Sequence, residues 1–158
     1  TAFKSIKILK DSGVEVELVC SGKASDDSYY NFLTDFINTN DLKNNIKLIG
    51  FISRFDQVQI MKESIAIIQP SLFEGWSTVV EDAKALDKKI ILSNLNVHRE
   101  QQPNKSTFFE PENFTELAEI IKRIQNFPNE KTDNYKLITD LNQQRKIYGE
   151  NIMKIFEK

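Results

Sequence analysis

The chain has 158 residues, of which 40% are hydrophobic and 28% are charged, and its formal net charge is −2. This length suits one domain with a substantial core. Without a basic excess, a nucleic-acid partner has no electrostatic support. The single Cys20 excludes an internal disulfide and a cysteine metal cluster, which suits a reducing, cytoplasmic setting. No apolar run approaches the roughly 18 residues of a membrane span.

The first residues predict a helix without a separate leader. Thr1 opens directly into AFKSIKILKDSG, in which Phe3, Ile6 and Leu9 fit one face of a helix that ends at Gly13. This opening has no initiator methionine, no signal-peptide pattern and little room for a helix cap. We therefore expect the sequence to be a piece of a longer protein.

Strand and helix patterns then alternate along the chain. Strands are expected at Val14 to Cys20, NIKLIGF, IAIIQP, KIILSN and STFFEP. Helices are expected at DSYYNFLTDFINTN, at SRFDQVQIMKES with Phe55, Val58 and Met61 inward, at TVVEDAKALD and at NFTELAEIIKRIQNF. The last of these carries an apolar stripe formed by Phe114, Leu117, Ile120, Ile121 and Ile124. After a break at Pro128, a final polar helix is expected at 131–157.

This order predicts an α/β fold. Short strands that are apolar on both faces, each followed by a helix, indicate a doubly wound parallel sheet with helices on both faces. Such folds bind ligands outside the carboxyl ends of their strands. We expect one domain over residues 1–130, with residues 131–158 forming its C-terminal helix.

The segment PSLFEGWSTVVEDA lies at such a carboxyl end, after IAIIQP. Gly75 allows a close backbone approach or a positive φ. Ser77 and Thr78 place hydroxyls beside the free N–H groups of a new helix, a position that suits a phosphate. An alternative is a simple capping box, with Thr78 as the cap and Glu81 three residues later.

The two neighbouring acids of this helix differ in direction. With about 100° per residue, Glu81 lies nearly opposite the apolar side and should face solvent or close the cap. Asp82 lies about a quarter-turn from the apolar side, on the same face as Thr78. Asp82 is therefore placed to accept hydrogen bonds from sugar hydroxyls. The alternative is an exposed acid in the first helical turn that is only stabilised by the helix dipole.

The segment PSLFEGWSTVVEDAKALDKKIILSN resembles the donor-binding part of the group 1, or family 4, retaining glycosyltransferases, which have the GT-B fold. Members typically have P-S-x-x-E-G-F-G-x-P-x-x-E-A-x-A-x-G followed by an apolar strand. The preceding IKLIGFISRFDQVQIMKESIAIIQPS and the later NVHREQ and FFEPEN fit the same order. The resemblance implies a Rossmann-like half of a GT-B enzyme that binds a nucleotide diphosphate sugar.

The family's spaced pair of acids falls on two residues here. Glu74 matches the first acid, which contacts the donor sugar and is the candidate catalytic residue. Asp82 matches the second, which holds the ribose hydroxyls and is usually Glu in the family. Glu81 is its neighbour and falls outside the pattern.

The remaining substrate contacts are implied by the same resemblance. Gly75, Trp76 and Ser77 match the Gly-aromatic-Gly turn whose backbone N–H groups meet the diphosphate, with Ser at position 77 in place of Gly. Phe51 and Ile52 match the loop that flanks the base. Taken alone, a tryptophan such as Trp76 is more often a packing residue than a sugar platform.

The chain also departs from the family pattern. The Arg and Lys that neutralise the diphosphate would precede Thr1, and the acceptor half is absent. Lys23 in CSGK is the one cation that we expect near the carboxyl end of a strand, and a solvent-facing side chain is the simpler interpretation. His98 in NVHREQ is more often a surface or hydrogen-bonded residue than a substrate contact. No metal or other cofactor is expected, because no metal-ligand spacing is present.

The resulting hypothesis is the donor half of a hexosyltransferase that acts with retention in bacterial polysaccharide or glycolipid synthesis. It would require the N-terminal acceptor half of the parent chain, be inactive alone, and be cytoplasmic or peripheral to the inner face of the membrane. A GT-B nucleotide-sugar epimerase half and a non-catalytic α/β interaction module remain alternatives. A response-regulator receiver domain does not fit, because the acids that it requires after its strands are not in place here. A dinucleotide dehydrogenase does not fit, because the sequence has no G-x-G-x-x-G.

Overall fold

Helices and strands alternate along the chain in the computed structural model, which describes residues 1–101 and 103–126. The elements are α1 (Ala2–Asp11), β1 (Leu18–Ser21), α2 (Asp27–Thr39), β2 (Ile46–Gly50), α3 (Arg54–Glu63), β3 (Ile67–Gln69), α4 (Thr78–Ala85), β4 (Ile90–Ser93), α5 (Asn96–Glu100), β5 (Ser106–Phe109) and α6 (Phe114–Gln125). Within the described residues, only the short α5 was not predicted. The helix expected at 131–157 lies outside them.

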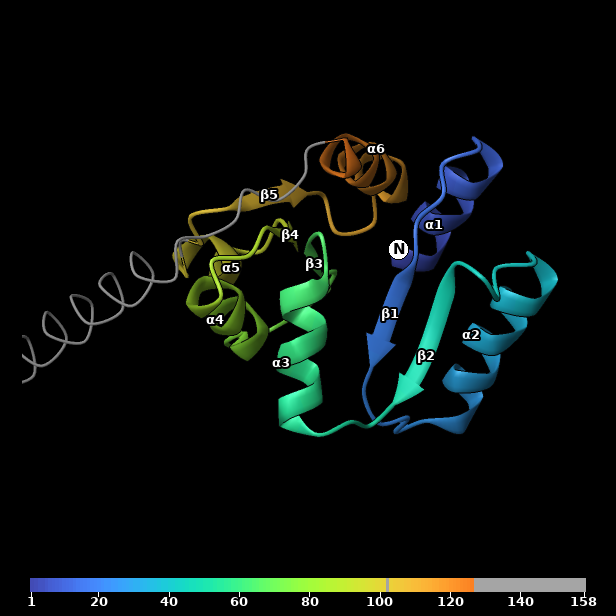
Figure 1. Cartoon of the computed structure of the whole chain (residues 1–158), viewed down its shortest axis with the longest axis horizontal. Coiled ribbons are helices and arrows are strands. Elements are labelled where there is room, and N and C mark those ends of the chain that lie inside the picture. The colour runs from blue at the N-terminus through green and yellow to red at the C-terminus, as the bar shows by residue number, and fades with distance from the viewer. Residues whose placement is uncertain (102, 127–158) are drawn as a thin grey trace, which may run out of the picture.

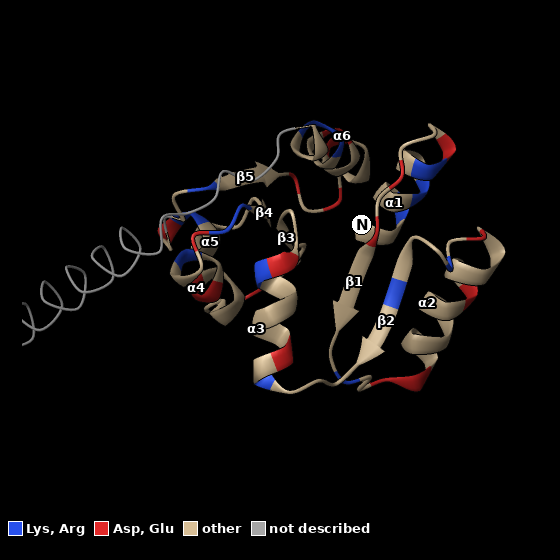
Figure 2. Ribbon diagram, in the orientation of Figure 1, with Lys and Arg blue, Asp and Glu red and all other residues tan. Residues whose placement is uncertain are grey.

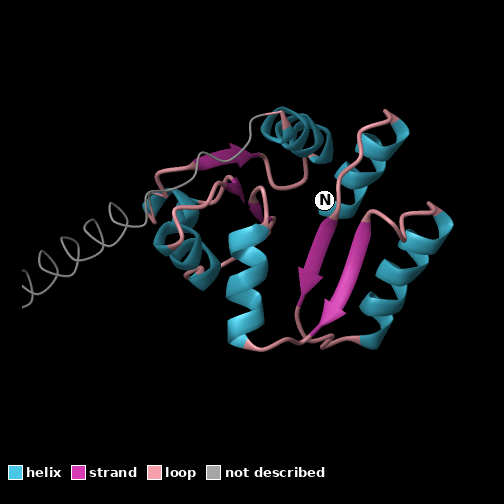
Figure 3. Ribbon diagram, viewed as in Figure 1, coloured by secondary structure: helices cyan, strands magenta, loops and turns pink. Residues whose placement is uncertain are grey.

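The strands are parallel and lie among helices, so the α/β Rossmann-like fold is confirmed (Figures 1 and 3). β1 pairs with β2, and β3, β4 and β5 form a second sheet with β4 in the centre. The ladder hydrogen bonds therefore divide the strands into two sheets, where the sequence predicted one. All the parallel pairs connect through a helix, as a parallel arrangement requires.

The first strand is shorter than predicted, because a side chain takes the place of its first ladder partner. The Asn45 side-chain amide donates to the carbonyl oxygen of Val16 at 3.1 Å. The backbone N–H of Leu18 donates to the carbonyl oxygen of Asn45 at 2.7 Å. The strand ladder thus starts at Leu18 and not at Val14.

The central strand β4 shows why helices cover both faces of its sheet. Ile90 and Leu92 pack with Val80 and neighbouring residues of α4. Ile91, which points to the opposite face, packs with Leu117 of α6. This alternation follows from the two-residue period of a strand, and it confirms for β4 the expectation of burial on both sides. In β1 and β2 the expectation is wrong, because Val19 and Ile49 are exposed.

Helix α6 connects the two sheets through its predicted apolar stripe. Leu117 and Ile120 are buried against β4 and β5. Ala118, on the adjoining side of the helix, joins the cluster formed by α1, α2 and β2. α6 and α1 lie side by side at the same edge of the molecule (Figure 1). One amphipathic helix therefore contributes to the hydrophobic core beside each of the two sheets.

The prediction for α3 was right at its end and wrong at its start. Met61 is buried, but Phe55 is 71% exposed. The first turn of α3 lies level with the carboxyl end of β2 (Figure 1).

Lys and Arg residues are interspersed with Asp and Glu residues along the ribbon (Figure 2). This agrees with the small net charge of −2. In the part of the chain that the structure describes, no helix has both the length and the apolar character to cross a membrane.

Leu117→Ala tests the connecting role of α6. We expect the free energy of unfolding to fall by about 2–5 kcal/mol, because the substitution leaves a cavity beside a fully buried position. Glu119→Ala, on the exposed side of the same helix, should change it by at most about 0.5 kcal/mol. Denaturant unfolding of both variants makes the comparison, and equal losses would contradict the assignment.

Candidate functional site

The predicted site is an open turn, residues 70–77, between the end of β3 and the start of α4. Phe73 and Trp76 are 88% and 55% exposed, so the expectation that Trp76 packs in the core is wrong. Gly75 has no positive φ, and a Cβ there would meet no described atom. Gly75 therefore leaves open space beside the backbone of the turn, and that backbone faces solvent.

The carboxylate of Glu74 is fixed through one of its two oxygens. Oε2 accepts hydrogen bonds from Gln69 Nε2 at 3.1 Å and from Ser71 Oγ at 3.0 Å, and it lies 3.1 Å from His98 Nε2. Oε1 takes part in none of these contacts, and the side chain is 20% exposed. The arrangement orients the carboxylate and leaves one oxygen for a ligand.

The surroundings of Glu74 favour its ionised form. Burial alone raises the pKa of this carboxyl group, but the hydrogen bonds from Gln69, His98 and Ser71, together with the nearby Ser77 hydroxyl, act in the opposite direction and lower its pKa below the usual value. The donors therefore outweigh the loss of solvent. Glu74 can accept a hydrogen bond from a ligand hydroxyl at neutral pH.

His98 lies on α5 and is fully buried. Its Nδ1 is 2.8 Å from the carbonyl oxygen of Ser93 at the end of β4, and its Nε2 faces Glu74. The expectation of a hydrogen-bonded histidine is confirmed, but its partner is the candidate catalytic acid. The feature of the sequence that could have identified His98 as a site residue is the position of NVHREQ directly after a predicted strand.

Gln101, at the end of α5, holds the other end of the turn. Its Oε1 accepts from the backbone N–H of Ser77 at 3.3 Å, and its Nε2 donates to the Ser77 carbonyl at 2.8 Å and to Glu81 Oε1 at 2.8 Å. The predicted Thr78–Glu81 capping box is wrong, because Ser77 is the N-cap and forms no side-chain cap. A distant amide has replaced the local cap, and sequence reasoning missed it.

The start of α4 keeps the features of an anion site. The hydroxyl of Ser77 is buried and has no hydrogen-bond partner within the described residues. No capping side chain covers the first N–H groups of the helix, which begin at Thr78. Because Gln101 engages the N–H of Ser77, the groups left for a ligand are those of Gly75, Trp76 and the first turn of α4.

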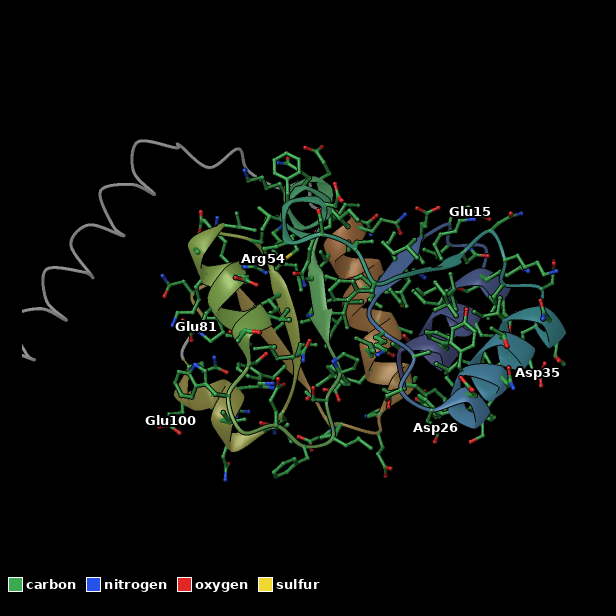
Figure 4. All side chains as sticks on the ribbon, turned by 90° about the horizontal axis from the view of Figure 1, so that it is seen from below. Glu15, Asp26, Asp35, Arg54, Glu81 and Glu100 are labelled. Atoms are coloured by element: carbon green, nitrogen blue, oxygen red, sulfur yellow. The ribbon has the colours of Figure 1, made fainter. Side chains whose placement is uncertain are left out.

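Asp82 is paired with a residue that the sequence analysis did not select. Arg54 Nη1 donates to Asp82 Oδ2 at 2.7 Å, and Arg54 Nη2 donates to Oδ1. The Asp82 side chain is 18% exposed and that of Glu81 is 40% exposed, which confirms the predicted difference between these acids. Figure 4 shows Arg54 and Glu81 beside α4.

This ion pair joins the start of α3 to α4. Arg54 begins α3 just after β2, so Lys23 is not the only cation near the carboxyl end of a strand, and Lys23 itself is exposed as expected. Phe51 is 84% exposed and Ile52 is half-buried. Both lie in the loop between β2 and α3, directly before Arg54.

A comparison with protein families identifies the family of the chain. The sequence model of the family described as "Glycosyl transferases group 1" matches residues 1–137. The chain belongs to this family. No match was found among the curated proteins.

Solved structures share the fold of this glycosyltransferase chain at low identity. A glycosyltransferase from Rickettsia africae ESF-5 is 22% identical, with a TM-score of 0.70 over 78% of this chain and 33% of that one. Anabaena Alr3699/HepE in complex with UDP is 20% identical, with a TM-score of 0.70 over 79% and 34%. The same protein with UDP-glucose is 20% identical, with a TM-score of 0.68 over 77% and 34%. The chain thus spans about a third of each.

Gln101→Ala tests the distant cap. We expect a loss of about 1–3 kcal/mol in the free energy of unfolding, because the buried N–H and carbonyl groups of Ser77 lose their partner. Gln101→Glu should be worse than Gln101→Ala, since it places a carboxylate beside the carbonyl oxygen and Glu81. Glu100→Ala, an exposed neighbour, is the control. Thermal or urea unfolding that ranks the three variants otherwise would contradict this role.

Proposed function

We propose that this glycosyltransferase chain is the donor-binding half of a retaining, family 4 hexosyltransferase. It would transfer a sugar from a nucleotide diphosphate sugar to an acceptor in bacterial polysaccharide or glycolipid synthesis. The family match and the fold shared with a protein bound to UDP-glucose support the donor class. The acceptor half would belong to the same parent chain, at the cytoplasmic face of the membrane or near it, and the 158 residues alone would not turn over.

The observation that carries the proposal is the one-sided fixation of Glu74. Three neighbours hold Oε2, while Oε1 receives none of their contacts. A carboxylate in this state accepts hydrogen bonds from sugar hydroxyls in a defined direction. We assign Glu74 to the donor sugar, where it orients the ring for transfer and stabilises positive charge that develops at the anomeric carbon.

The diphosphate is assigned to the start of α4. The N–H groups of its first turn and the positive end of the helix dipole favour an anion. The unpartnered hydroxyl of Ser77 adds a donor, and the open space at Gly75 admits the phosphate to the backbone of Gly75 and Trp76. In this proposal the diphosphate charge is met by these groups and by cations of the missing half, without a resident metal.

The ribose is assigned to Asp82 and the base to the loop of Phe51 and Ile52. Each oxygen of Asp82 receives one hydrogen bond from Arg54, and a carboxylate oxygen has a second acceptor site. Asp82 can therefore bind ribose hydroxyls while it stays paired. Arg54 fixes the direction of the acid and connects the base loop to the ribose site.

Calorimetric or NMR titration of the chain with UDP and UDP-glucose tests the function. We expect weak binding, at about 4–6 kcal/mol, because the cations of the other half are missing. Amide shifts should concentrate at 74–82 and 51–54 and should persist in a metal chelator. Gly75→Ala should leave the melting temperature nearly unchanged and weaken binding, since its Cβ would occupy the space for the ligand. Shifts confined to the opposite edge of the sheets would contradict the assignment.

Substitutions of the two neighbouring acids, Glu81 and Asp82, should affect different measurements. Asp82→Ala removes a charge-assisted hydrogen bond to ribose, which should lower the binding free energy by roughly 1.5–3 kcal/mol. Glu81→Ala removes a contact to Gln101, so it should lower the melting temperature slightly and leave UDP affinity nearly intact. Measuring affinity and melting for both variants makes the test. If Glu81→Ala abolished binding and Asp82→Ala did not, the ribose assignment would be wrong by one residue.

A further inference from the structure

Both ring nitrogens of His98 face oxygen atoms. Nδ1 is 2.8 Å from the carbonyl oxygen of Ser93 and 3.4 Å from Ser93 Oγ, and Nε2 is 3.1 Å from Oε2 of Glu74. An ionised carboxylate only accepts, so a hydrogen bond between His98 and Glu74 needs a proton on Nε2. The Ser93 hydroxyl can then donate to Nδ1.

The other neighbours of Glu74 favour its carboxylate form, which can only accept. Oε2 also accepts from Ser71 Oγ and Gln69 Nε2, and these hydrogen bonds stabilise the carboxylate. The ring of His98 is fully buried, and its contact with the Ser93 carbonyl sets its orientation. Nε2 is therefore the ring nitrogen that donates to Glu74.

We propose that His98 is a positioning residue that holds Glu74 as a buried hydrogen-bonded pair, with Nε2 as the donor to Oε2. The proposal deepens the proposed function, since it rests on the assignment of Glu74 to the donor sugar. The pair fixes Oε2 against α5 and so turns Oε1 toward the sugar. Because the Ser93 carbonyl orients the ring, the position of the carboxylate is set by the end of β4.

The position of the ring proton can be read without any ligand, because His98 is the only histidine of the chain. Long-range ¹H–¹⁵N NMR of the ring should show a proton on Nε2. Glu74→Gln should move the ring proton to Nδ1, since the new amide can donate to Nε2. A ring without a proton on Nε2 in the unaltered chain, or a ring unaffected by Glu74→Gln, would overturn the proposal. This result does not depend on donor binding.

Two matched variants separate the bond to Glu74 from the bond to Ser93. A glutamine amide nitrogen reaches about as far as Nε2, so His98→Gln keeps a donor for Glu74. An asparagine amide nitrogen matches Nδ1, so His98→Asn keeps only the donor for the Ser93 carbonyl. If His98 only anchors α5, then His98→Asn should be the milder change. If His98 positions Glu74, then His98→Gln should be the milder change.

The readout is the affinity for UDP-glucose relative to that for UDP, because only the first has the sugar that Glu74 is assigned to hold. We expect His98→Asn to weaken UDP-glucose binding roughly ten- to hundredfold, with UDP binding much less affected. His98→Gln should retain most of the difference between the two ligands. The reverse order, or equal losses for both ligands, would overturn the positioning role. If the unaltered chain bound neither ligand, the proposed function would fail, and the ring spectrum would still decide whether the pair exists.

Discussion

The structure around the turn depends on the convergence of three side chains on one oxygen of Glu74. A carboxylate that is mostly removed from water needs such partners, because an uncompensated buried charge is strongly unfavourable. The partners come from β3, from the turn itself and from α5. Satisfying this one group therefore fixes three elements relative to one another. The second oxygen takes part in none of these three contacts.

A second contact from α5 holds the far end of the same turn. His98 contacts Glu74, and three residues later Gln101 contacts the backbone of Ser77, three residues beyond Glu74. The one-turn spacing of α5 thus matches the length of the segment that it supports. α5 in turn follows β4, the central strand of its sheet, so a fully buried strand sets the geometry of a turn with exposed residues. This rigid support suits a site that must hold a flexible phosphorylated ligand.

The sequence predicted those features that depend on local periodicity. Short apolar runs identified the parallel strands, the stripe of α6 identified its buried face, and the helix wheel separated Asp82 from Glu81. Features that depend on distant partners were missed. The cap of α4 comes from Gln101, 24 residues after Ser77, and Arg54 meets Asp82 across 28 residues, so no local pattern encodes either contact. Trp76 was expected to pack because large aromatic residues usually do, whereas this open turn leaves it exposed.

The most direct test is a crystal structure of the chain with UDP-glucose. We expect a glucose hydroxyl within hydrogen-bond distance of Glu74 Oε1, the diphosphate at the first turn of α4, and the contact between His98 and Oε2 unchanged. That result would show that the turn is formed before the donor binds. A nucleotide bound away from the carboxyl ends of the strands, or a Glu74 that leaves His98 to meet the sugar, would contradict the account.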